Sequence, residues 1–187
     1  GEVGPLAALF AWYFCVIGAA FVGRAVRDAL FLSHLGARQL PAMYIASPLI
    51  VTAVGLGYAR VEGRLRRDRL VIATASCGGL ALLGARALLG TGTWIFYVLY
   101  VGVSVLSGLV IMQLWTVAAD RFTARDGKRL FGLIGAGGTV ADIAIGAALA
   151  MLAPRIGAEN LLVLAAGLLL AAAALAALLR RMSGGRL

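Results

Sequence analysis

Six long runs of apolar residues, separated by short polar connections, occupy almost the whole of this 187-residue chain. Each run is close to the roughly 20 residues that a helix needs to cross a hydrocarbon layer. The runs cover about residues 5–32, 40–61, 70–90, 94–119, 130–153 and 160–179. The pattern predicts an all-α integral membrane protein, a bundle of six transmembrane helices that forms a single domain over residues 1–187.

The composition of two of the runs indicates where they lie in the bundle or in the membrane. The stretch "LLVLAAGLLLAAAALAALL" of the sixth run has no polar side chain, so we expect this helix to lie at the periphery of the bundle and to face lipid. The fourth begins with Trp94, Tyr97 and Tyr100, which are typical of anchors at the membrane–water interface.

Composition and charge support the membrane interpretation and orient the chain. Hydrophobic residues make up 62% of the sequence and charged residues 13%, whereas a soluble domain carries about 25% charged residues. The net charge of +9 gathers between the second and third runs, between the fourth and fifth, and after the sixth. All three places fall on one side of a six-span bundle, which predicts that both termini are cytoplasmic. The charge therefore indicates contact with the lipid bilayer and its anionic headgroups, and not with nucleic acid.

The end of the first run carries three charged residues, Arg24, Arg27 and Asp28, where lipid would favour apolar ones. Arg24 and Asp28 are four positions apart, so they share a helix face and can pair. Ionisable groups at this depth usually face a bundle interior or a wet cavity. The alternative is an ion pair that snorkels to the outer interface.

Two further polar residues stand inside apolar runs. Gln113, near the cytoplasmic end of the fourth run, needs a partner for its amide. Asp142 falls near the middle of the fifth run, and its expected partners are Arg24 and Arg27. It is a candidate functional residue, although a purely structural buried pair is also consistent with its position.

The stretch "KRLFGLIGAGGTVAD", residues 128 to 142, has the glycines of a phosphate-binding loop but not its order. A P-loop needs its lysine after the last glycine, whereas Lys128 and Arg129 come first. The glycines instead predict a face on which the fifth helix packs closely against another.

Enzymatic chemistry finds no support in the sequence. The chain has one histidine, His34, and its two cysteines, Cys15 and Cys77, lie in separate apolar runs with no metal-ligand spacing. No pattern of nucleophile and base or of paired catalytic carboxylates is present. We therefore expect no catalytic residue, no metal and no cofactor.

Two segments resemble the ATP/ADP translocase family of plastids and bacteria, which are nucleotide carriers related to the major facilitator superfamily. "RAVRDALFLSHLGARQLP" is similar to the end of the family's first helix, with Arg27 and Asp28 at its basic–Asp pair. "RDGKRLFGLIGAGG" is similar to the loop before its fifth helix, with Lys128 and Arg129 matching.

The resemblance implies nucleotide exchange across a bacterial inner membrane, with the cations of the first helix contacting phosphates in a central cavity. Together with the depth of Gln113 and Asp142 in their runs, it predicts a substrate-binding site formed by Arg24, Arg27, Asp28, Gln113 and Asp142. It also predicts a cytoplasmic gate or anchor at Asp120, Lys128 and Arg129.

Carriers of this kind consist of two six-helix halves around a midplane site, so the chain corresponds to the amino-terminal half. A second half or a second copy of the chain would complete it. The competing interpretation is an accessory subunit, a transporter half that serves as scaffold among unrelated membrane subunits and transports nothing.

Overall fold

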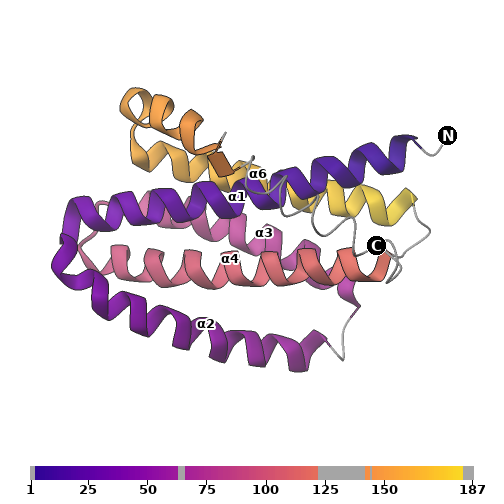
Figure 1. The fold of residues 1–187 in the computed structure, drawn as a ribbon, viewed down its shortest axis with the longest axis horizontal. Coiled ribbons are helices and arrows are strands. Elements are labelled where there is room, and N and C mark those ends of the chain that lie inside the picture. Colours follow the sequence, from indigo (N-terminus) through magenta and orange to yellow (C-terminus); the bar gives the residue numbers. More distant parts are fainter. Residues whose placement is uncertain (1–2, 63–65, 122–141, 144, 183–187) are drawn as a thin grey trace.

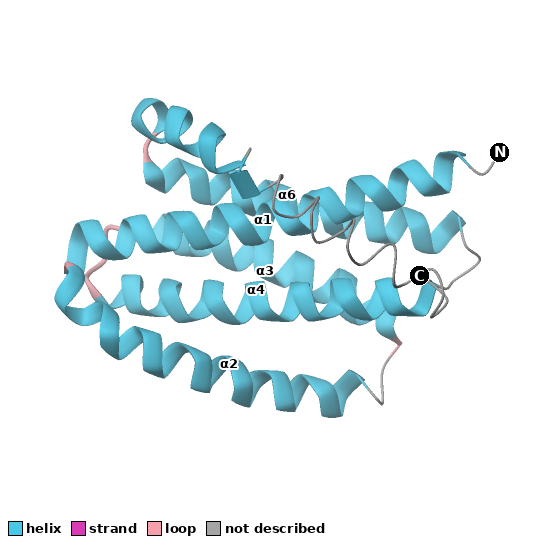
Figure 2. Ribbon diagram, viewed as in Figure 1, coloured by secondary structure: helices cyan, strands magenta, loops and turns pink. Residues whose placement is uncertain are grey.

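The structure, a computed structural model, describes residues 3–62, 66–121, 142–143 and 145–182. Every element in these ranges is helical, as the sequence predicts (Figure 2). The long helices are α1 (Val3–Leu35), α2 (Leu40–Glu62), α3 (Arg67–Leu88), α4 (Trp94–Arg121) and α6 (Ala158–Met182), joined by a short 3-10 helix, η1 (Ala37–Gln39), and a shorter helix over Ile145–Ile156.

Glycines end two of these helices. The amide of Gly36 donates to the Leu32 carbonyl at 3.2 Å, and that of Gly157 donates to the Ala153 carbonyl at 2.9 Å. Both have a positive φ, of 75° and 79°, which a residue with a Cβ adopts only with strain. They therefore stop α1 and the helix Ile145–Ile156 in the way typical of helix carboxyl ends.

The long helices lie side by side and alternate in direction (Figure 1). The chain enters at one end of the bundle, and α2, α4 and α6 finish there. The arginines that follow or end these helices therefore gather at that end, which we call the basic end. The opposite end holds η1 and the turn between α3 and α4.

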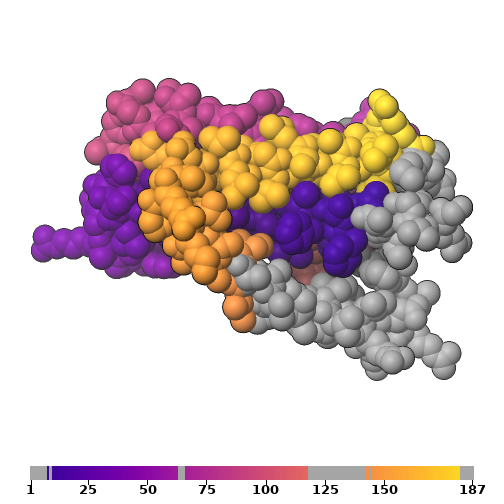
Figure 3. All heavy atoms as spheres, turned by 90° about the horizontal axis from the view of Figure 1, so that it is seen from above, coloured from indigo at the N-terminus to yellow at the C-terminus, as the bar shows by residue number. Residues whose placement is uncertain are grey.

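The packing centre is a seam between α1, α3, α4 and α6. Figure 3 shows α6 between α1 and α3, with both neighbours along much of its length. The face of α6 that enters the seam is completely or almost completely buried; its residues are Leu161, Leu162, Ala165, Ala166, Leu169, Ala172, Ala173, Ala176 and Leu179. The expectation that the sixth run is peripheral is therefore wrong. Its alanines, at helical spacing, let the backbones approach closely, which is how helices associate in lipid.

The helix α2 takes the peripheral place instead. Among the long helices its main packing partner is α4, and Tyr44, Ile45 and Leu49 expose more than 60% of their surface. Only 11% of the residues in its most apolar stretch are buried, against 44% for α6.

Four helical segments are long and apolar enough to cross a membrane, namely Ala37–Glu62, Arg67–Leu88, Trp94–Val117 and Ala158–Arg181. The membrane class predicted from the sequence is thus confirmed at this level. The first predicted span corresponds to α1, which has 33 residues and carries the three charged residues of its run. The described part of the fifth is the short helix Ile145–Ile156.

Candidate functional site

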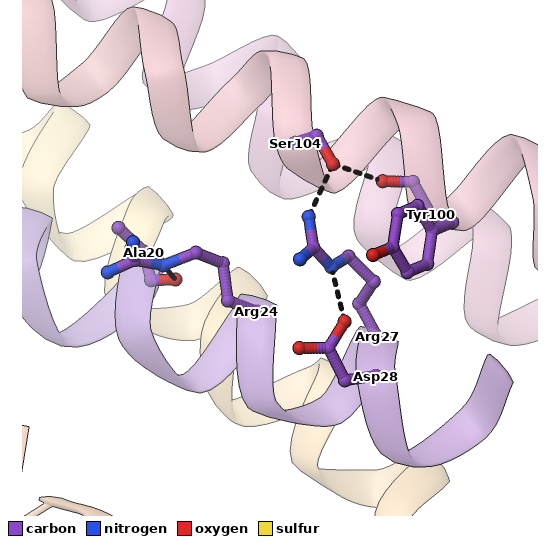
Figure 4. A network of polar contacts seen from close by, with 6 residues as sticks. All are labelled: Ala20, Arg24, Arg27, Asp28, Tyr100 and Ser104. Atoms are coloured by element: carbon purple, nitrogen blue, oxygen red, sulfur yellow. Dashed lines mark hydrogen bonds and ion pairs between the residues drawn. The ribbon is translucent and has the colours of Figure 1, made fainter. Parts of the chain in front are cut away.

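Arg27 is the centre of a polar network that joins α1 to α4 (Figure 4). Its Nε donates to Oδ1 of Asp28 at 2.9 Å, and its Nη1 donates to the Ser104 hydroxyl. The Ser104 hydroxyl donates in turn to the Tyr100 carbonyl at 2.7 Å. The guanidinium carbon of Arg27 lies 4.2 Å from the centre of the Tyr100 ring, which adds a cation–π contact. We call these four residues the Arg27 network.

The Arg27 network lies well inside the two helices and not at their ends. Arg27 is eight residues from the end of α1 at Leu35, and Ser104 is ten residues from the start of α4 at Trp94. At about 1.5 Å per residue these separations correspond to roughly 12 and 15 Å, close to the middle of a layer about 30 Å thick. The Arg27 side chain is 13% exposed and that of Asp28 is 41% exposed. A charge at this depth is tolerated because it is paired and hydrogen-bonded.

Arg24 has different surroundings, although it is only one turn away. It is exposed, its Nε donates to the Ala20 carbonyl of its own helix at 3.2 Å, and its side chain runs away from the network (Figure 4). Within the described part of the chain, no other hydrogen bond or ion pair engages its guanidinium. Arg24 therefore presents a cation about 17 Å from the carboxyl end of α1, on a face that the described part of the bundle leaves open.

The charged residues pair differently from the sequence expectation. Asp28 pairs with its neighbour Arg27, not with Arg24 four positions away. Asp142 is half-buried, and no ion pair within the described ranges joins it to either arginine. The helices themselves are neighbours, since a Cβ on Gly146 would lie 3.8 Å from Cζ of Phe21. The helices α1 and Ile145–Ile156 are therefore neighbours, but the described residues do not form the predicted ion-pair cluster of Asp142 with Arg24 and Arg27.

Gln113 finds the partners that its buried amide requires. It is 4% exposed, and its Nε2 donates to the Tyr58 hydroxyl at 2.7 Å and to the Thr74 hydroxyl at 2.9 Å. Since Tyr58 lies on α2 and Thr74 on α3, this amide ties three helices together. Gln113 follows Ser104 by nine residues on α4, or about 14 Å, so it belongs to a separate polar centre.

Ion pairs also join helices at both ends of the bundle. At the end opposite the basic end, Arg86 of α3 lies 3.2 Å from Glu159 and donates to the Asn160 amide oxygen at 3.3 Å, both on α6. At the basic end, Arg67 lies 3.7 Å from Glu62. These contacts connect successive or adjacent helices and lie away from the Arg27 network.

The remaining predicted gate residues lie beyond what the structure describes. Asp120 lies in α4, but its side chain is outside the described atoms, as are Lys128, Arg129 and the glycines of the 128–142 stretch.

The sequence interpretation missed Tyr100 as a member of the site. It was expected to be an interface anchor, but it is 1% exposed and lies beneath Arg27. Its spacing from Ser104 is the signal that could have found it, because residues four apart lie on one helix face. Tyr58 and Thr74 carried no such signal, since they lie on different helices from Gln113.

Comparisons of the chain with family models, with curated proteins and with solved structures find no match. Within the described residues, no group of three or more His, Cys, Asp and Glu side chains could hold a metal ion. The site is therefore interpreted from its own residues. Arg27 is hydrogen-bonded inside the protein, and Arg24, one turn away at a similar depth, is exposed.

Proposed function

We propose that this chain is one six-helix half of a membrane transporter for an anionic solute of the nucleotide class. It carries the solute without covalent chemistry. The observation that carries the proposal is the exposed Arg24, 11 residues or about 17 Å from the carboxyl end of α1 and thus at the depth of the middle of a hydrocarbon layer. An arginine in contact with lipid at such depth costs about 2.5–3.5 kcal/mol or more, so this face is expected to border water, a ligand or a partner.

Arg24 is the group suited to contact phosphate. A guanidinium offers fixed donors that match pairs of phosphate oxygens, and in Arg24 only Nε is engaged within the described protein. Arg27 has a positioning role, because Asp28, Ser104 and the Tyr100 ring already surround its guanidinium. In this division of roles, Arg27 fixes α1 against α4 and thereby sets the place of Arg24.

The rest of the transporter comes from a second six-helix half or a second copy of the chain facing this surface of α1. The proposal includes six spans, with both termini and the basic end on the cytoplasmic side of a bacterial inner membrane. The supporting features are the four apolar segments of sufficient length and the grouping of arginines at one end of the bundle.

Calorimetric titration of ATP into the purified protein tests the proposal. Arg24→Gln should reduce the affinity about 10- to 100-fold, as expected for a lost charge-assisted hydrogen bond, while leaving the melting temperature unchanged. Arg60→Gln is the matched control, because Arg60 also donates to a carbonyl of its own helix, at 3.4 Å from Leu56. Arg27→Gln should mainly lower the melting temperature. Absence of ATP binding by the unmodified protein, both as a monomer and as a dimer, would exclude a nucleotide carrier.

One observation favours the scaffold alternative. The Arg27 network is closed on itself, as in a structural ion pair, and a partner's carboxylate could cover Arg24 equally well. A scaffold predicts that the protein is extracted from its membrane in a stoichiometric complex with unrelated subunits. It also predicts that Arg24→Gln disrupts this complex without any effect on nucleotides.

A further inference from the structure

The helices α3 and α4 do not close against each other along their outer faces, and an apolar groove of about 610 Å³ lies between them. Its α3 wall runs from Ala73 to Ala85, and Gly102 lies on its α4 wall. The groove is lined almost entirely by apolar side chains, with Thr74 and Cys77 as the exceptions. Cys77 is exposed, so the groove opens to the surroundings of the bundle.

A cation, Arg69, stands at the basic end of this groove. Arg69 is four residues before Ala73, so it lies on the same face of α3, one turn closer to the basic end. It is exposed, and in the described ranges it has no ion pair or hydrogen bond of its side chain. Its neighbours differ, because Arg66 lies 3.5 Å from Asp68 and Arg67 lies 3.7 Å from Glu62.

The length of the groove is close to the thickness of the hydrocarbon in one leaflet of a bilayer. Twelve residues separate Ala73 from Ala85, or about 18 Å of helix, against about 15 Å for half of a hydrocarbon layer. Arg69 lies about 6 Å outside this stretch, at the level of the headgroups. The volume corresponds to roughly 20 water-sized units, enough for one long hydrocarbon chain.

We propose that the α3–α4 groove binds one anionic phospholipid, with an acyl chain along the groove and the phosphate against Arg69. Arg69 at one end of an apolar channel selects this occupant, because a phospholipid carries its charge and its hydrocarbon in that order. An apolar helix from another subunit would fill the groove but leave Arg69 unmatched. This site lies on different faces of the bundle from Arg24, so it does not depend on the transport proposal.

Native mass spectrometry of the detergent-purified chain tests the site, with phosphatidylglycerol and phosphatidylcholine as probes. We expect phosphatidylglycerol to bind about fivefold more tightly, as one basic residue near a headgroup contributes about that much. Arg69→Gln should remove this preference. Arg67→Gln, which makes the same change of charge two residues away at a paired arginine, should retain it.

A groove-filling variant tests the acyl chain separately. A Cβ on Gly102 would meet nothing within 4 Å, so a side chain has room to start at this position of the groove wall. Gly102→Leu should therefore occupy part of the groove and weaken binding of both lipids. Gly55→Leu on α2 is the control, since Gly55 is equally unobstructed and lies outside the groove. If Gly102→Leu does not fold, Ala81→Leu fills the same space from α3.

Three results of the lipid-binding measurements would overturn the proposal. They are equal retention of the two lipids by the unmodified protein, an Arg69→Gln variant that behaves like Arg67→Gln, and unchanged lipid binding after the groove is filled. Protection of the Cys77 thiol from alkylation by a co-purified polypeptide would also overturn it, since the groove would then hold protein.

Discussion

Arg24 and Arg27 are three positions apart in α1, and helix geometry alone gives them different surroundings. Arg27 follows Gly23 by one turn, and a Cβ on Gly23 would lie 3.3 Å from Cγ1 of Val103 on α4. This face of α1 therefore meets α4, and Ser104 is the next residue along. Arg24 lies about 60° around the helix from Arg27, outside this contact. Arg27 thus joins α1 to α4 inside the protein, whereas Arg24 presents its charge on the outside.

The contribution of the Arg27 network to stability can be measured through Ser104. Ser104→Ala removes the acceptor for Nη1 of a mostly buried guanidinium, so it should lower the free energy of unfolding by about 1–2 kcal/mol. Thr116→Ala is the control, because the Thr116 hydroxyl donates only to the Met112 carbonyl of its own helix, at 3.0 Å, and should cost less than about 0.5 kcal/mol. Reversible unfolding in detergent measures both. Equal effects of the two substitutions would contradict a structural role for the network.

At the scale of elements, small residues decide which helices form the centre. A Cβ on Gly79 of α3 would lie 2.8 Å from Cγ of Leu170 and 3.2 Å from the Ala166 carbonyl of α6. The two helices therefore touch at a distance that only glycine permits. Alanines on the facing stripe of α6 extend this contact, whereas α2 packs mainly against α4 and lies outside the seam.

This explanation predicts opposite effects for two glycines of one helix. Gly79→Ala should lower the free energy of unfolding by about 1–3 kcal/mol, because α6 must move away or distort. Gly84→Ala should be neutral or slightly stabilising, since a Cβ there meets nothing within 4 Å and alanine favours the helix. Thermal unfolding of the two variants in the same detergent is the measurement. A loss of stability for Gly84→Ala as large as for Gly79→Ala would show that close α3–α6 contact is not the cause.

At the scale of the whole molecule, the alternation of helix direction places the connections at two opposite ends. Arg38 of η1 and Thr91, between α3 and α4, lie at one end, and Arg181 of α6 lies at the other. If the helices span a membrane, these ends lie on opposite sides of it.

Cysteine labelling of the protein in sealed membrane vesicles of known orientation tests this topology. In a background with Cys15 and Cys77 changed to serine, Arg38→Cys and Thr91→Cys should react from one side and Arg181→Cys from the other, with Arg181 cytoplasmic. Thr91 is preferred to Gly92, whose φ of 151° disfavours a side chain. Labelling of all three from the same side would exclude the proposed arrangement.

The sequence by itself determined the helical class, the positions of the helices and the gathering of charge at one end. Apolar runs of about 20 residues have few alternatives to a helix in lipid, and their boundaries agree with α2, α3, α4 and α6 to within a few residues. It also singled out Arg24, Arg27, Asp28 and Gln113, because polar groups stand out against an apolar background.

Only the tertiary structure decided which faces are inside and which polar groups meet. Lipid is as apolar as the protein interior, so hydrophobicity does not distinguish a central helix from a peripheral one. The sixth run, which is apolar from Leu161 to Leu179, was placed wrongly for this reason. The partners of Gln113 lie on two other helices, 55 and 39 positions away in the chain. Likewise, spacing along α1 permits Arg24 or Arg27 to pair with Asp28. The position of Ser104 and Tyr100 on α4 decides that Arg27 turns inward and that Arg24 remains exposed.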